Sequence, residues 1–255
     1  MNEQKQPLRR GPKPKDEALV LRDQYWALFV KSKFPDESYA SLERVLYPHL
    51  KITRREDSLG YSQPCKPSKI ARGKHGLSRT LGALPAVVER AEALVPGAIE
   101  AFTSILWTAL MPPLMSTHDG DRRGSISIEV TSRLNARHFA PKSAVHAGIG
   151  LLNVQGIRRL SRLRHLDALG LLLCYCPVHM KPSKLSLTAE AYVLYLLQRC
   201  CDKDPGLMAI KSSLIKLLSA RFRIQANTRC SYAGKVFLAP RVSSFAVGLR
   251  SLLDP

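Results

Sequence analysis

The side chains best suited to chemistry in this sequence are cations, and they gather in three segments. The first segment, residues 1–15, interleaves Arg9, Arg10, Lys13 and Lys15 with proline and glycine. Proline disfavours a helix here, so we expect these cations on an extended, flexible arm. Such an arm can lie in the minor groove of A·T-rich DNA and add charge-driven affinity. The alternative is a solubilising tail.

The second basic segment covers residues 66–79 and carries the following cations: Lys66, Lys69, Arg72, Lys74 and Arg79. A basic helix fits the major groove of DNA, where its side chains reach phosphates and base edges. The alternative is a solvated basic loop.

The third basic segment, residues 156–165, predicts a phosphate-binding ridge on a helix. At helical spacing, Arg158, Arg162 and His165 fall on one face, and the apolar residues of the segment turn largely away from it. Asp167 is the one carboxylate close by in the sequence, so little opposes this charge. The alternative is an ordinary solvated helix face.

The sequence gives only weak indications of metal binding or catalysis. Cys174 and Cys176 lie two residues apart, which directs their thiols to roughly opposite sides of a helix, so we assign them to core packing rather than to zinc. The sequence contains no Walker A loop, no GxGxxG motif after a strand, no Gly-x-Ser-x-Gly elbow and no HExxH helix. We therefore predict a non-catalytic protein with no metal and no cofactor.

The overall charge favours a polyanionic partner. The chain has 255 residues, and its 39 Lys and Arg against 20 Asp and Glu give a formal net charge of +19. Residues 1–129 carry 20 basic and 15 acidic side chains, whereas residues 130–255 carry 19 and 5, so most of the excess lies in the second half. A soluble protein rarely carries so much charge of one sign without such a partner. Aromatic residues make up only 7%, which disfavours single-strand binding by base stacking.

The sequence also indicates the cellular compartment of the protein. No apolar stretch approaches the roughly 20 residues that a membrane span needs, and the chain opens on polar and basic residues rather than on a signal peptide. Six cysteines are too few for a disulfide scaffold. We expect a cytoplasmic protein in a reducing compartment, with no membrane partner.

The elements that must position these side chains form a mainly α, multi-helical fold. Helices are predicted at 16–33, 36–47, 85–95, 98–110, 142–152, 155–175, 186–201, 205–222 and 242–253, and one or two short strands at 125–131 and 235–238. Asp36 is expected to cap the second helix. The predicted parts are a basic flexible arm at 1–15, a helix-turn-helix-like domain at 16–110, a linker at 111–124 and a basic, mainly helical domain at 125–255.

The first half of the chain carries two resemblances to known proteins. Residues 66–79 resemble the part of phage-repressor-type helix-turn-helix proteins in which a basic recognition helix ends at a glycine and a new helix begins near a serine. The resemblance implies that Ile70 faces inward from a short helix, that Gly73 ends this helix and that Ser78 caps the next one. The long loop before Ser68 departs from the short turn of that motif. Roughly the first 110 residues also contain Trp26, Leu42-Glu43-Arg44, Arg72-Gly73, Val95-Pro96-Gly97 and Trp107. In these positions the chain is similar to a group of uncharacterised bacterial proteins carried on plasmids and integrated elements.

Together, the charge and the resemblances predict a nucleic-acid-binding protein, with DNA favoured over RNA. Its expected role is that of a DNA-binding regulator or maintenance factor of a bacterial mobile element. The alternative is a non-catalytic basic structural subunit of a ribonucleoprotein or defence complex, which would hold RNA or a protein partner.

Overall fold

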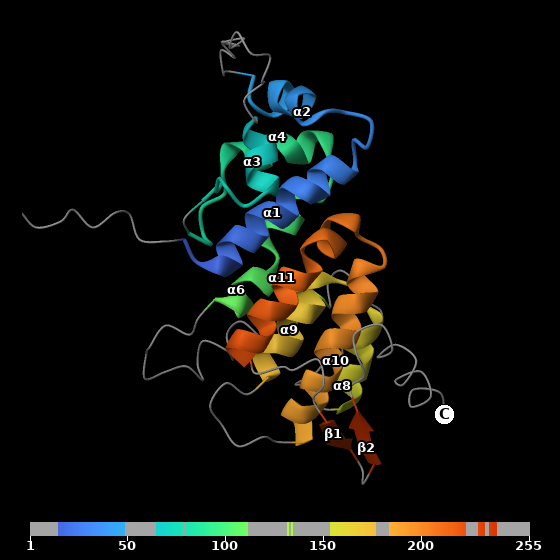
Figure 1. Ribbon diagram of the computed structural model, residues 1–255. Helices are drawn as coiled ribbons and strands as arrows, with labels where there is room; N and C mark the ends of the chain where they lie inside the picture. The colour runs from blue at the N-terminus through green and yellow to red at the C-terminus, as the bar shows by residue number, and fades with distance from the viewer. Residues whose placement is uncertain are drawn as a thin grey trace, which may run out of the picture.

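The fold is mainly helical, as predicted (Figure 1). The computed structural model describes residues 15–48, 65–78, 80–111, 132, 134, 154–176, 184–222, 229–232 and 235–238. The arm at 1–14, nearly all of the linker at 111–124, the strand predicted at 125–131 and the helices predicted at 142–152 and 242–253 lie outside the described residues. Among the helices that are described, none is both long and apolar enough to cross a membrane.

Local capping places the first helices. The first half contains α1 (Glu17–Ser32), α2 (Tyr39–Leu46), α3 (Lys66–Ala71), α4 (Ala86–Leu94), α5 (Ala98–Thr103) and α6 (Ile105–Leu110). Asp16 begins α1, and its carboxylate accepts a hydrogen bond from the N–H of Ala18 at 2.8 Å. Ser38 begins α2, and its hydroxyl accepts from the N–H of Ser41 at 3.1 Å. The prediction that Asp36 caps this helix is therefore wrong, because Asp36 lies in the preceding turn.

The single helix predicted at 98–110 is two helices, because the backbone of Ser104 is extended, with φ −53° and ψ 136°. The hydroxyl of Ser104 accepts from the N–H of Leu106 at 3.3 Å. The carboxylate of Asp167, from the second half of the chain, accepts from the Ser104 hydroxyl at 2.8 Å and from the N–H of Ile105 at 3.0 Å. A distant side chain thus completes the cap of α6.

The second half contains α8 (Val154–Arg162), α9 (Leu166–Tyr175), α10 (Lys184–Cys201), α11 (Pro205–Phe222), and an antiparallel hairpin of β1 (Arg229–Tyr232) and β2 (Lys235–Leu238), with Arg229 opposite Leu238. α11 and β2 have the predicted bounds. The helix predicted at 155–175 is divided, because Arg164 adopts a φ of +47° and His165 starts a new helix. The Nδ1 atom of His165 accepts from the N–H of Asp167 at 3.1 Å and so caps α9.

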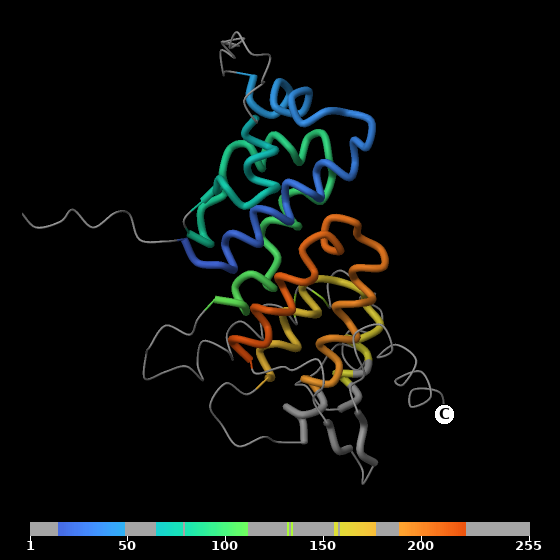
Figure 2. Tube along the Cα trace, in the orientation of Figure 1, coloured from blue at the N-terminus to red at the C-terminus, as the bar shows by residue number. Residues whose placement is uncertain are grey.

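Two hydrophobic clusters hold these helices together. The smaller cluster joins α1 to α2, α3, α4 and α5 and includes Trp26 and Ile70. The larger cluster joins α1, α5 and α6 to α8, α9, α10 and α11 and includes Trp107. α1 contributes to both, and Figure 2 shows it between α2, α3 and α4 on one side and the orange helices of the second half on the other. The larger cluster therefore contains residues from both predicted domains.

Two glycines let helices from the two halves approach closely. A Cβ atom on Gly206, in α11, would lie 2.9 Å from the backbone nitrogen of Phe29 in α1. A Cβ atom on Gly170, in α9, would lie 2.7 Å from the backbone nitrogen of Leu106 in α6. Both distances are too short for any larger residue, so these contacts set the spacing of α11 on α1 and of α9 on α6.

Candidate nucleic-acid interface and adjoining cavity

The second basic segment forms a helix of only six residues, α3, followed by a long loop. Ile70 is fully buried, as predicted, and Gly73 follows the helix with a φ of +70°. The prediction that Ser78 begins a helix is wrong. Its hydroxyl instead accepts from the N–H of Thr80 at 3.1 Å within a turn, and the next helix begins only at Ala86.

This loop is fixed by a buried charge pair on α1. Arg22 donates to the carbonyl of Ser78 at 3.3 Å, to the carbonyl of Thr80 at 3.0 Å, and to the carboxylate of Asp23 at 3.0 Å. Asp23 also accepts from the N–H of Leu77 at 2.7 Å. Burial lowers the pKa of Arg22, and the adjacent Asp23 opposes that effect. The loop is therefore held in place by α1 rather than by a following helix.

The cations of residues 66–79 differ in their surroundings. Lys66 places its ammonium group 5.2 Å from the ring centre of Tyr47, and Lys69 is half-buried. Arg72 and Lys74 are exposed. Within the part of the chain that the structure describes, neither of these two side chains makes a hydrogen bond or an ion pair, so both are available to a partner.

Among the cations predicted for the amino-terminal arm, only Lys15 is described. Its ammonium group bonds to the buried carboxylate of Asp23, so it belongs to the fold rather than to a free arm. Arg9, Arg10 and Lys13, together with Arg79 of the second segment, lie outside the described residues.

The ridge predicted on the third basic segment is only partly correct. Ile157 and Leu160 are buried and Arg162 is exposed, as expected for one face of α8. The side chain of Arg158 lies outside the description. His165 does not share this helix: it is the cap of α9, and its Nε2 atom lies 2.5 Å from the carboxylate of Glu100. The expected group of Arg158, Arg162 and His165 is therefore wrong for His165.

The structure presents a different set of exposed cations at the end of α8, which we call the arginine cluster: Arg159, Arg162 and Arg164. Among the described residues, Arg162 and Arg164 make no hydrogen bond or ion pair. On the continuous helix that the sequence predicted, Arg164 would point roughly 200° away from Arg162. The break after α8 removes that constraint, and no local pattern in the sequence indicated the break.

Several carboxylates of the described residues are occupied within the fold instead of neutralising these arginines. Asp16 pairs with Arg221 at 2.9 Å. Glu92 accepts from the N–H groups of Gly97 at 2.9 Å and of Ile99 at 2.6 Å, and these hydrogen bonds lower its pKa. These two carboxylates therefore serve the fold.

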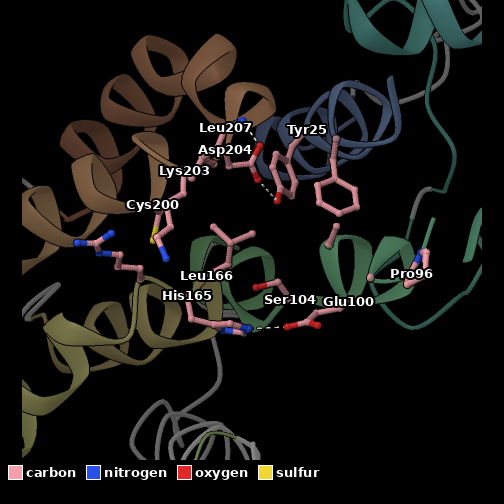
Figure 3. A pocket seen from close by; sticks show the side chains of 14 residues that line it. Tyr25, Pro96, Glu100, Ser104, His165, Leu166, Cys200, Lys203, Asp204 and Leu207 are labelled. Atoms are coloured by element: carbon pink, nitrogen blue, oxygen red, sulfur yellow. Dashed lines mark hydrogen bonds and ion pairs between the residues drawn. The ribbon is translucent and has the colours of Figure 1, made fainter. Parts of the chain in front are cut away.

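A cavity of about 310 Å³ adjoins the arginine cluster, where α1 and α5 meet the start of α9 and the turn between α10 and α11 (Figure 3). Two polar contacts face each other across it. On one side the hydroxyl of Tyr25 donates to Asp204 at 2.7 Å, and on the other the ring of His165 contacts Glu100. Arg164 and Lys203 also line the cavity.

Two potential nucleophiles of this cavity, Tyr25 and Cys200, have raised pKa values. Burial, with Asp204 next in importance, raises the pKa of Tyr25. Burial, with the neighbouring Cys201 next in importance, raises the pKa of Cys200 to about 12, so its thiol is neutral at physiological pH and is a poor nucleophile. Within the described ranges, no group of three His, Cys, Asp or Glu residues is arranged to hold a metal ion.

Comparison of the chain with protein-family models, with curated proteins and with solved structures gave no match. The side chains and their geometry are therefore the basis for assigning a function.

Proposed function

We propose that this protein binds nucleic acid through the arginine cluster, with duplex DNA as the favoured target. The observation that carries the proposal is the exposure of Arg162 and Arg164, which make no ion pair within the described part of the chain. A guanidinium group offers paired N–H donors that match the oxygens of a phosphate. The net charge of +19 would draw a polyanion to this surface and speed its association.

A second contact is proposed at Arg72 and Lys74, on the loop that Arg22 and Asp23 hold against α1. Because α3 is short and its Pro67, Ser68 and Ile70 are buried, it has little free surface with which to enter a groove. Phosphate contacts from the loop fit this geometry better than base reading from the helix. Phosphate contacts add affinity to all sequences alike.

The biological role proposed for this binding rests on the resemblance of the first 110 residues to proteins of plasmids and integrated elements. A DNA-binding regulator or maintenance factor of such an element would use the exposed arginines to contact the DNA phosphates. A basic subunit of a ribonucleoprotein complex would instead hold structured RNA, and the preferred nucleic acid separates these roles.

The first test is a competition assay at fixed salt, in which duplex DNA, single-stranded DNA and structured RNA compete for the full chain. We expect duplex DNA to compete best. A clear preference for structured RNA would replace the DNA-binding role by the ribonucleoprotein role. Absence of binding to all three would overturn the proposal.

The second test concerns the arginine cluster. In an Arg162→Ala/Arg164→Ala variant, the slope of log affinity against log salt should fall by about 2, because each lost phosphate contact removes about 0.9. A Lys33→Ala/Lys216→Ala variant removes the same charge from exposed positions elsewhere and should change the slope little. Equal slopes for the two variants would show that charge alone, without a defined site, accounts for binding.

The third test concerns the loop. An Arg72→Ala/Lys74→Ala variant should weaken binding to a preferred duplex and to a random duplex by the same factor, since phosphate contacts do not distinguish sequences. A selective loss on the preferred duplex would instead assign base reading to this segment, because base-edge contacts discriminate by about 1–3 kcal/mol each.

A further inference from the structure

The cavity beside the arginine cluster has the composition of a small-molecule site. Its volume of about 310 Å³ lies at the lower end of the range for such sites. Phe29, Leu166 and Leu207 supply apolar surface, and the remaining lining includes a few charged groups. The lining comes from both halves of the chain, and junctions of this kind are a common place for ligand sites.

The carboxylates of the cavity are already occupied. One oxygen of Asp204 accepts from the Tyr25 hydroxyl at 2.7 Å, and the other accepts from the N–H groups of Gly206 at 2.9 Å and Leu207 at 3.2 Å. Glu100 contacts the imidazole of His165 at 2.5 Å. Both carboxylates of the cavity therefore already have partners within the protein.

The long cationic side chains of the cavity are not used in this way. Arg164 and Lys203 are exposed, and among the described residues neither makes a hydrogen bond or an ion pair. Arg164 also adopts a φ of +47°, a conformation that residues other than glycine rarely adopt and that is enriched at functional sites. The cavity thus has two free cationic donors, whereas its carboxylates already have partners, and this balance suits an anion.

We propose that this cavity binds a small organic anion. A carboxylate or phosphate group of the ligand contacts Lys203 and Arg164 at the opening. The apolar body of the ligand packs against Phe29, Leu166 and Leu207. Because Arg164 also belongs to the arginine cluster, the ligand site and the proposed nucleic-acid surface meet at this residue, while Lys203 belongs to the cavity.

The test uses benzoate and phenyl phosphate as anionic probes, with benzyl alcohol as a neutral probe of similar shape and inorganic phosphate as an anion without an apolar body. Ligand-observed NMR on the full chain should detect both organic anions at millimolar concentrations and detect the other two much more weakly. Failure of both organic anions to bind would overturn the proposal. Equally strong binding of benzyl alcohol or of inorganic phosphate would also overturn it.

Variants locate the binding. Lys203→Glu should weaken the affinity for benzoate at least about tenfold, whereas Lys216→Glu, at an exposed position of α11 outside the cavity lining, should leave it unchanged. Leu166→Trp should block binding by filling the cavity, with the fold checked by circular dichroism. Unchanged benzoate affinity in Lys203→Glu or in a folded Leu166→Trp variant would place the anion elsewhere and overturn the proposal.

The two proposals fail separately. Arg162→Ala should weaken nucleic-acid binding and leave benzoate binding intact, since Arg162 does not line the cavity. A protein that binds benzoate but no nucleic acid would refute only the proposed function. A protein that binds nucleic acid but no organic anion would refute only the cavity proposal.

Discussion

Asp167 links two helix ends that lie far apart in the sequence. Its side chain accepts hydrogen bonds from Ser104 and from the N–H of Ile105, at the start of α6. Its backbone N–H donates to His165, at the start of α9. Because the carboxylate is buried, these hydrogen bonds help to offset the cost of desolvating it. From the sequence, Asp167 was merely the carboxylate nearest to a basic segment, whereas in the fold it is a structural cap.

Asp167→Ala should therefore lower the free energy of unfolding by about 1–3 kcal/mol, because it leaves the buried Ser104 hydroxyl and Ile105 N–H without their partner. Asp202→Ala removes an exposed carboxylate and should change stability by less than about 0.5 kcal/mol. Urea unfolding measures both. A loss no larger for Asp167→Ala than for Asp202→Ala would contradict the capping role.

The raised pKa values of Cys200 and Cys201 should make the stability of the fold depend on pH. Burial raises the pKa of each thiol to about 12, whereas a thiol in the unfolded chain ionises near 8.5. As the pH rises above the pKa of the unfolded thiols, the unfolded state loses protons and the folded state does not. The free energy of unfolding therefore falls. The limit is about 1.4 kcal/mol per pH unit for each cysteine.

This dependence is checked by urea unfolding at about pH 8 and about pH 10, on either side of the pKa of an unfolded thiol, where the loss of stability begins. The wild-type protein should be less stable at the higher pH. A Cys200→Ala/Cys201→Ala variant should show a smaller difference between the two conditions, whatever its absolute stability. An equal difference in both proteins would rule out the two thiols as its source.

The helices predicted at 98–110 and at 155–175 are each broken in the structure, and the two breaks face each other. The break between α5 and α6 presents Ser104 to Asp167, at the start of α9. The break between α8 and α9 presents His165 to Glu100, on α5, at 2.5 Å. Each break therefore receives a polar partner from the element on the other side. This reciprocal arrangement also forms one wall of the cavity and places Arg164 at its edge.

The close approach of helices at Gly170 and Gly206 makes a testable prediction. Gly170→Ala and Gly206→Ala should each destabilise the fold by about 1–3 kcal/mol, because the new Cβ atom would push α9 from α6 or α11 from α1. Gly82→Ala is the matched control, since a Cβ atom there would meet nothing within 4 Å. Thermal unfolding compares the three variants, and equal midpoints would show that these helices can separate without cost.

For the whole molecule, α1 is the element on which both hydrophobic clusters depend. Its Trp26 lies in the smaller cluster, and its Tyr25, one position earlier, lies in the larger cluster beside Trp107. The Tyr25 and Trp107 rings are 5.6 Å apart between centres. Unfolding either cluster would expose one face of α1, so we expect the described parts of both halves to unfold together.

The two tryptophans of the chain allow this expectation to be measured, because both are buried and each reports on one cluster. A Trp107→Phe variant leaves Trp26 as the fluorescence probe, and a Trp26→Phe variant leaves Trp107. In each variant, the urea transition followed by fluorescence should coincide with that followed by far-ultraviolet circular dichroism. Separate transitions would indicate that the halves are independent domains.

The candidate site was predictable from the sequence only in part. Charge counts and spacing identified Arg72, Lys74 and Arg162 as cations for a partner, and the structure exposes all three. Lys15, on the arm, and His165, on the third basic segment, were also predicted to contact nucleic acid, but both make polar contacts within the fold. Whether a cation faces outward depends on carboxylates that only folding brings near, such as Asp23 and Glu100.

Nearby residues in the sequence are enough to specify several of the helices. Asp16 begins α1 and Pro205 begins α11. Between the ends of each helix, the spacing of the apolar residues is visible in the local sequence alone. The breaks at Ser104 and before His165, by contrast, depend on tertiary packing. The carboxylate that stabilises the first break, Asp167, lies 63 residues from Ser104, and a hydrogen bond across that separation exists only once α6 and α9 have packed. Local propensity favoured a continuous helix at both places, and packing outweighed it.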